Sequence, residues 1–296
     1  MMTRETFIRL LGKLPNKVLP ILSIIDEVDC GSFLRRTIEY AVEQDERIKA
    51  FLCLPHTSTA QNPAIFCHHQ HAGNYLLGKS EVVGLSGDKD QAYAKELAER
   101  GFITLSPDAI CFEDRCQHKD SPENSHVHEL HTRLLRGETL LGKILHDMSV
   151  GIDILQSLTE VDSDRIGFIG HSYGGRTALF APVFDRRIKT SVCNGGSSNY
   201  RDMSGIQFDF VLPDIIQHGD IEDIVRLVEP TNLLISGSDH DKWSIGIEAM
   251  AAYAQSTFHQ GEFRHHVSSG GHQFTPEMRE RAYAFLSKHL NQPADA

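Results

Sequence analysis

The chain has 296 residues, of which 40% are hydrophobic and 23% charged, a composition typical of a globular protein with a sizeable core. The formal net charge of −11 argues against nucleic acid or an anionic membrane surface as a partner. No apolar run approaches the roughly 20 residues of a membrane span, and the first 23 residues lack the features of a secretory signal. We therefore expect a cytoplasmic protein.

Strands and helices are predicted to alternate along most of the chain. After a short amphipathic helix at 3–12, two strands at 33–42 and 48–54 flank a polar turn and predict a hairpin. Further strands are expected at 64–68, 102–108, 165–169, 189–193, 232–236 and 262–269. Further helices are expected at 88–101, 136–160, 176–181, 220–229, 245–258 and 276–290.

This element order predicts an α/β fold whose mostly parallel sheet is covered by helices on both faces, with an antiparallel hairpin at its N-terminal side. Residues 1–30 are expected to form a helical extension, and residues 31–296 a single domain with insertions near 111–135 and 195–220. In open sheets of this kind the site lies outside the carboxyl ends of the strands. The loops at those ends are therefore where chemistry is expected.

The clearest motif is the G-x-S-x-G pattern around Ser172, within the stretch IGFIGHSYGG at residues 166–175. It lies between a predicted strand and a predicted helix, which is the context of a nucleophile elbow. The sharp turn needs residues without a Cβ atom at Gly170 and Gly174. The alternative is an ordinary glycine-rich turn between strand and helix, of the kind that can bind phosphate.

A serine nucleophile needs a histidine to accept its proton and an acid to orient that histidine. In the order serine, acid, histidine, the later strand ends supply Asp239 or Asp241 and then His272, which follows two glycines. Neighbouring side chains of an extended loop diverge, so only one aspartate is expected to face His272. The residues alone leave both open.

An oxyanion hole requires two backbone N–H groups. The first is expected from Tyr173, directly after the nucleophile, and the second from the loop HQHAG at 69–73, which follows the strand at 64–68. The histidines of that loop offer a metal site as the alternative. The group Cys111, Cys116 and His118 matches no common zinc pattern, so we expect neither a metal nor another cofactor.

Taken together, these motifs resemble the α/β-hydrolase superfamily, in its dienelactone-hydrolase-like and acetyl-xylan-esterase-like branch. The resemblance runs from about residue 30 to 290 and is carried by four segments: HQHAGN, ELAERGFITLSPDAICFEDR, LLGKILHDMSVGIDILQSLTEVDSDRIGFIGHSYGG and GGHQFTPEMRERAYAFLSKHL. It implies that the second oxyanion donor is the backbone N–H of His71, and that Glu113 and Arg115 form a buried ion pair. Gln70 stands where relatives have glycine.

The resemblance also bears on the acid. Relatives carry it three residues after the glycine at the strand end, which is His240 here, so a one-residue shift favours Asp241 over Asp239. Dienelactone hydrolases proper use a cysteine nucleophile, and the serine here points to simple esters instead.

The sequence thus predicts a serine hydrolase that cleaves a small carboxylic ester through an acyl-enzyme on Ser172. The alternatives are a non-catalytic protein that binds a ligand on the same fold, and a thioesterase, lactonase or C–C hydrolase with the same triad. The expected partner is a small-molecule ester, with no nucleic acid and no membrane. The sequence indicates neither the substrate nor the oligomeric state.

Overall fold

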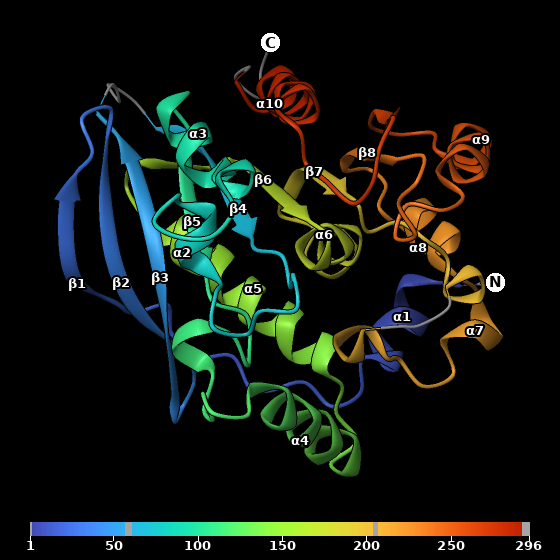
Figure 1. Cartoon of the computed structure of the whole chain (residues 1–296), viewed down its shortest axis with the longest axis horizontal. Helices are drawn as coiled ribbons and strands as arrows, with labels where there is room; N and C mark the ends of the chain where they lie inside the picture. Colours follow the sequence, from blue (N-terminus) through green and yellow to red (C-terminus); the bar gives the residue numbers. More distant parts are fainter. Residues whose placement is uncertain (1, 57–60, 204–206, 292–296) are drawn as a thin grey trace.

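A sheet of nine strands forms the centre of the computed structural model, which describes residues 2–56, 61–203 and 207–291 (Figure 1). The strands are β1 (Leu22–Asp29), β2 (Phe33–Glu43), β3 (Glu46–Pro55), β4 (Asn62–His68), β5 (Ile103–Pro107), β6 (Val161–His171), β7 (Ile188–Asn194), β8 (Asn232–Ser238) and β9 (Phe263–Ser268).

The strand order across the sheet is β1-β2-β3-β5-β4-β6-β7-β8-β9. The pairs β1–β2, β2–β3 and β3–β5 are antiparallel, and every pair from β5 to β9 is parallel. The predicted hairpin, β2 with β3, and the predicted mostly parallel sheet are both confirmed. The carboxyl ends of the six parallel strands consequently meet at one edge of the sheet.

Helices cover both faces of the sheet. The α-helices are α1 (Arg4–Leu10), α2 (Lys79–Val82), α3 (Tyr93–Glu99), α4 (Pro122–Leu135), α5 (Leu140–Ser157), α6 (Tyr173–Phe184), α7 (Ile215–His218), α8 (Ile221–Leu227), α9 (Ile247–Thr257) and α10 (Pro276–Leu290). The 3₁₀ helices are η1 (Lys89–Gln91), η2 (Glu113–Arg115), η3 (Tyr200–Asp202) and η4 (Phe208–Phe210). Over the described residues, none of these helices has both the length and the apolarity needed to cross a membrane.

The core consists of two apolar clusters, one on each face. Alternate residues of β4 point to opposite faces, so Phe66 joins one cluster and Ile65 the other. Helices α1, α5, α6, α8 and α9 pack on the Phe66 side, and α2, α3 and α10 pack on the Ile65 side. Figure 1 shows α3 and α10 on one side of the sheet and α5 on the other. The side chains of β4 are buried on both faces, as is usual for parallel strands.

The first 30 residues differ from the expected helical extension. Among residues 2–30, α1 is the only helix, and residues Leu22–Asp29 form β1, the edge strand beside β2. The sequence of β1, LSIIDEVD, lacks the alternation of apolar and polar residues that marks a half-buried strand, and nearly all of its residues are exposed. These residues form a strand because they pair with β2, and no local sequence pattern predicts that pairing.

The two predicted insertions contain helices that the sequence pattern did not reveal. Helix α4 lies in the 111–135 insertion, and η3, η4 and α7 lie in the 195–220 segment, of which residues 204–206 are outside the described part. The long helix expected from residue 136 begins instead at Leu140, where the Thr139 side chain accepts a hydrogen bond from the Gly142 N–H.

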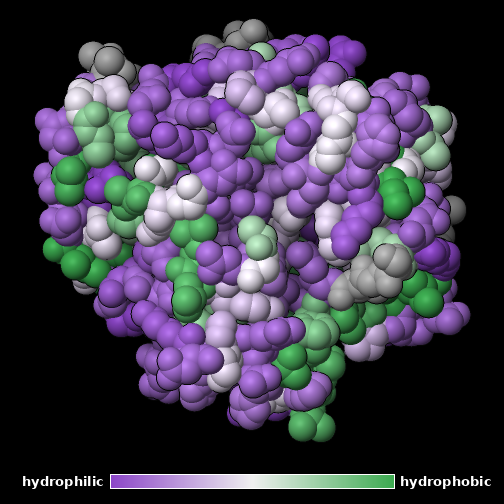
Figure 2. Space-filling view, viewed as in Figure 1, coloured by the Kyte–Doolittle hydropathy of each residue, from purple (hydrophilic) through white to green (hydrophobic). Residues whose placement is uncertain are grey.

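The face of the molecule seen in Figure 2 is largely hydrophilic, with apolar residues at its left edge, where β1 lies. Ile24, Ile25 and Val28 of β1 are exposed there by 51%, 52% and 38%. Asp26, Glu27 and Asp29 lie in the same strand, and charged residues on an edge strand disfavour pairing with other chains.

A buried network of charges joins the hairpin to α5. The ammonium group of Lys143 is fully buried and pairs with Glu43, Glu46 and Asp147. Burial alone would lower the pKa of Lys143, but attraction to these carboxylates outweighs burial and raises it. The network therefore fixes the antiparallel part of the sheet against the helix that precedes β6.

We expect Lys143→Met to lower the free energy of unfolding by about 2–3 kcal/mol, because it removes the buried cation beside Asp147, Glu43 and Glu46, of which Asp147 and Glu46 keep Arg115 as a partner. The matched control is Lys17→Met, since Lys17 pairs with Asp153 but is 52% exposed. The control substitution should lower the free energy of unfolding by less than about 1 kcal/mol. Urea unfolding of both variants checks this, and equal small losses would contradict it.

Candidate functional site

Ser172 stands at the sharp turn between β6 and α6, with φ 57° and ψ −114°. A positive φ is strained for a residue with a side chain and persists only where its surroundings enforce it. A Cβ atom on Gly170 would lie 2.2 Å from the carbonyl carbon of Gly174, and one on Gly174 would lie 2.0 Å from the carbonyl oxygen of His68. The two glycines therefore let the turn close against β4.

The structure brings Ser172, His272 and Asp241 together. The Nε2 atom of His272 lies 2.7 Å from the Ser172 hydroxyl oxygen, and its Nδ1 lies 3.0 Å from Oδ2 of Asp241. Ser172 is 7% exposed and the Asp241 side chain 1%. The three side chains come from the ends of β6, β9 and β8, three strands that end at the same edge of the sheet.

The hydrogen-bond directions follow from the chemistry of the groups. A carboxylate can only accept, so Nδ1 of His272 carries the hydrogen that faces Asp241. In the neutral ring, Nε2 then has a lone pair that can accept the proton of the Ser172 hydroxyl. This arrangement is able to turn a serine into a nucleophile.

Asp241 is held by more than the histidine. It accepts hydrogen bonds from the Ser244 hydroxyl at 2.6 Å and from the Trp243 N–H at 2.9 Å. Burial raises the pKa of Asp241, but the hydrogen bonds from His272, Ser244 and Trp243 outweigh burial and hold the pKa below its usual value. The carboxylate is thus kept charged beside the imidazole.

Asp239 lies in the same loop but does not contact the imidazole of His272. It accepts a hydrogen bond from the Gly270 N–H at 2.9 Å, and its side chain is 48% exposed beside His240. The hydrogen bond from Gly270 lowers the pKa of Asp239. Asp239 therefore ties the loop after β8 to the glycine turn that precedes His272.

The two expected oxyanion donors lie on neighbouring segments. The Tyr173 N–H opens α6, where the first N–H groups of a helix have no partner inside it. The loop after β4 carries His71, whose ring lies 6.2 Å from the ring of Tyr173. Among the described residues, the His71 N–H donates no hydrogen bond to the protein. The ring contact places the loop of His71 beside the first turn of α6.

Asn194, at the end of β7, is a site residue that the sequence analysis missed. Its backbone oxygen accepts from the Ser172 N–H at 2.8 Å. Its side-chain nitrogen donates to the Gln273 oxygen at 3.0 Å and to Nδ1 of His171 at 2.7 Å. One buried residue thus links the serine turn to the loop that carries His272. Its position at a strand end was the only signal in the sequence.

His171 is kept uncharged beside His272, at a ring separation of 4.6 Å. Burial and the neighbouring His272 lower the pKa of His171 to about 3. Its Nδ1 accepts a hydrogen from Asn194, which also favours the neutral ring. A positive charge is thereby excluded from the face of His272.

The expected ion pair between Glu113 and Arg115 is wrong. Glu113 instead binds Lys79, with Nζ at 2.7 Å, while Arg115 binds Glu46 and Asp147. The two side chains belong to one turn of 3₁₀ helix, η2, but meet partners on different elements. Glu113 holds the start of α2, after the loop that carries His71, and Arg115 joins the charge network around Lys143.

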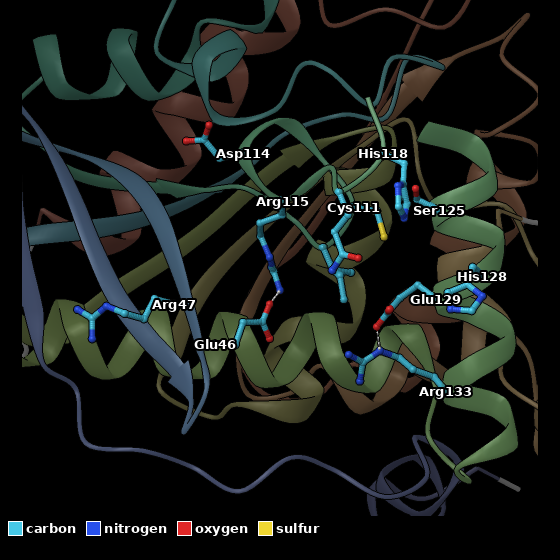
Figure 3. Close-up of a pocket in the computed structure, with 12 residues that line it drawn as sticks. Glu46, Arg47, Cys111, Asp114, Arg115, His118, Ser125, His128, Glu129 and Arg133 are labelled. Atoms are coloured by element: carbon cyan, nitrogen blue, oxygen red, sulfur yellow. Dashed lines mark hydrogen bonds and ion pairs between the residues drawn. The ribbon is translucent and has the colours of Figure 1, made fainter. Parts of the chain in front are cut away.

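A cavity of about 330 Å³ lies apart from Ser172, His272 and Asp241, between the start of β3, η2 and α4 (Figure 3). Its polar lining includes Arg115, which points toward Glu46, and Arg133, which points toward Glu129. Neither Ser172 nor His272 lines it. Within the part of the chain that the structure describes, no three histidine, cysteine or acidic side chains are grouped to hold a metal ion.

Comparisons with known proteins find hydrolases among those that this chain is similar to. Residues 77–207 match the model of the Dienelactone hydrolase family. YtaP of Bacillus subtilis, a protein classed by its name among the hydrolases, is 28% identical over 304 residues, which cover 97% of this chain and 98% of YtaP.

Solved structures share the fold at low sequence identity. A Bacteroides fragilis protein described as an acetyl xylan esterase has a TM-score of 0.73 at 16% identity, over 89% of this chain and 73% of that protein. A glucuronoyl esterase from Solibacter usitatus has a TM-score of 0.68 at 15% identity, over 97% of this chain and 91% of that protein. The chain thus has the α/β-hydrolase fold, and its residues 77–207 are similar to the Dienelactone hydrolase family.

Proposed function

We propose that this protein is a serine hydrolase that cleaves a small carboxylic ester through an acyl-enzyme on Ser172. The proposal rests on two hydrogen bonds of His272, one to the Ser172 hydroxyl at 2.7 Å and one to the Asp241 carboxylate at 3.0 Å. The family match and the esterases among the structural neighbours support a carboxylic ester hydrolase.

In the proposed acylation, Nε2 of His272 takes the hydroxyl proton while the Ser172 oxygen bonds to the ester carbonyl carbon. The carbonyl oxygen becomes an oxyanion, which accepts hydrogen bonds from the N–H groups of Tyr173 and His71. When the tetrahedral intermediate collapses, the bond to the alcohol oxygen breaks, and the imidazolium returns its proton to that oxygen. The alcohol leaves, and the acyl group stays on the serine.

Water completes the cycle by the same route. His272 takes a proton from a water molecule, whose oxygen attacks the acyl carbon and forms a second oxyanion. Collapse releases the carboxylic acid and returns the proton to Ser172. Asp241 keeps its charge throughout, which stabilises the imidazolium formed in both halves. Every proton and electron pair in this scheme is handled by the three side chains, the substrate and water.

We also propose a cytoplasmic location. All six cysteines are free thiols, and five of them are buried. Disulfides are rare in the cytosol and frequent in secreted proteins, so this cysteine usage favours a reducing compartment.

Ser172→Ala should abolish hydrolysis of short-chain p-nitrophenyl esters and labelling by a fluorophosphonate, while the melting temperature stays close to that of the wild type. Intact-mass spectrometry with peptide mapping should find a single adduct on Ser172 of the wild-type protein. A folded wild-type protein without an adduct would favour a ligand-binding role instead. Turnover retained in the variant would rule out the proposed nucleophile.

Asp241→Asn should lower kcat on the order of 10⁴-fold, because the amide favours the wrong histidine tautomer. Asp239→Asn is the matched control from the same loop. Its contacts, with the Gly270 N–H and with His240, lie outside the triad, so the variant should lower kcat by less than about tenfold. Steady-state kinetics on one ester compares the two, and similar losses would show that neither aspartate orients His272.

The pH dependence should report one ionisation on the acid side. The folded pKa of Asp241 is lowered from 3.8, so its carboxylate persists at every pH above that value, and only the histidine must lose a proton. The logarithm of kcat/KM should therefore fall with a slope of one as the pH is lowered toward about pH 4. A slope of two in that range would mean that Asp241 titrates with the histidine.

A further inference from the structure

A second buried chain of hydrogen bonds lies beside the nucleophile. Oδ1 of Asp209 lies 2.9 Å from Nε2 of His126 and accepts from the Tyr173 hydroxyl at 3.2 Å. On the other side of the imidazole, Nδ1 of His126 lies 2.9 Å from the Tyr75 hydroxyl. The Asp209 and His126 side chains are 0% and 1% exposed. These four groups form one continuous line between two tyrosines.

The directions of these bonds are fixed by Asp209. Its carboxylate can only accept, so Nε2 of His126 carries the hydrogen that faces it. When the ring is neutral, Nδ1 can then only accept, and its partner is the Tyr75 hydroxyl. Burial and the charge of Asp209 raise the pKa of Tyr75 to about 12, and they also raise the pKa of Tyr173. Both phenols therefore keep the hydrogens that they donate.

The line ends on the two segments that carry the proposed oxyanion donors. Tyr173 supplies the first donor through its own backbone N–H, and its hydroxyl is anchored on Asp209. Tyr75 lies four residues after His71 in the loop of the second donor, and their rings meet edge to face at 4.7 Å. The His71 ring also lies 6.1 Å from the ring of His126.

The loop of the second donor has a backbone that its own sequence does not favour. Ala72 has a φ of 47° and Gly73 a φ of 69°, so a non-glycine residue holds a strained conformation directly after His71. Within the loop, the Gly73 N–H donates to Nδ1 of His71, and the Asn74 N–H donates to the His71 oxygen. These local bonds shape the loop but do not fix its distance from α6.

We propose that Asp209, His126 and Tyr75 act as a positioning relay that sets the distance between the oxyanion-hole amides of Tyr173 and His71. The inference rests on the proposed function and adds that the insertions near 111–135 and 195–220 position the oxyanion hole. His126 comes from α4 and Asp209 from η4, so segments outside the triad hold the hole in shape. Directional bonds define a distance, whereas a purely apolar contact would allow the loop to slide.

The test uses Tyr75→Phe and Tyr173→Phe, each of which removes one hydroxyl and keeps the ring and the backbone. Displacing a group by about 1 Å can cost up to about 100-fold in rate. We expect each variant to lower kcat by about 10–100-fold on a p-nitrophenyl ester, with KM changed less than about threefold. Tyr283→Phe is the control, because Tyr283 donates a similar bond to Glu96 on the side of the sheet covered by α3 and α10.

A second readout separates positioning from a structural role. A trifluoromethyl ketone adds to Ser172 and places an oxyanion in the hole, whereas a ground-state ester uses the hole less. The inhibition constant of the ketone should rise by about tenfold or more in Tyr75→Phe and Tyr173→Phe and stay unchanged in Tyr283→Phe. His126→Gln keeps an N–H donor for Asp209 but loses the hydrogen bond to the Tyr75 hydroxyl. Its loss in kcat should therefore equal that of Tyr75→Phe. The double variant His126→Gln with Tyr75→Phe should have a kcat no lower than either single variant.

Wild-type kcat and inhibition constants in Tyr75→Phe and Tyr173→Phe would overturn the relay. So would losses that follow the melting temperature and appear equally in Tyr283→Phe. If the wild-type protein neither hydrolyses esters nor reacts with a fluorophosphonate, the proposed function fails and the relay with it. If the wild type reacts and Ser172→Ala does not, but the tyrosine variants behave normally, the function stands and the relay alone is wrong.

Discussion

The strained backbone of Ser172 is the constraint on which the site depends. A positive φ at a residue with a side chain costs about 1–3 kcal/mol and must be enforced from outside. Here the enforcement comes from the close approach of Gly170 to Gly174, the contact of Gly174 with the end of β4, and the hydrogen bond to the Asn194 oxygen. The same turn raises the hydroxyl above the sheet and starts α6 with an unpaired N–H. Nucleophile and first oxyanion donor therefore follow from one local geometry.

The parallel sheet turns this local geometry into a site. Because β4, β6, β7, β8 and β9 end at one edge, each can supply one part: a loop for the second donor, the serine, Asn194, the acid and the histidine. Buried polar contacts between neighbouring strand ends then fix these parts relative to one another. Asn194 is the clearest case, since its single side chain contacts both the segment before Ser172 and the one after His272.

The sequence predicted those features that depend on neighbours along the chain. The turn at Ser172 and the strand-end position of His272 are visible in short motifs, and the hairpin and parallel strands follow from periodicity. The choice between Asp239 and Asp241 depends on a loop whose shape is set by the Gly270 N–H, about thirty residues away, and local spacing cannot fix it. The sequence analysis also missed β1, helix α4 and the contact of His126 with Asp209. Each of them depends on a partner that is distant in the sequence.

The contact of α4 with η4 has a consequence for changing the substrate range of this enzyme. Loops around an α/β sheet can usually be exchanged without disturbing the strands, which makes an inserted helix an attractive place to graft new binding surfaces. Here α4 carries a histidine that is hydrogen-bonded on both sides, to Asp209 and to Tyr75 in the loop of the proposed second oxyanion donor. A grafted segment that omits this histidine would alter turnover along with recognition. Redesign of the insertion must therefore retain position 126 or replace the whole tyrosine–histidine–aspartate unit together.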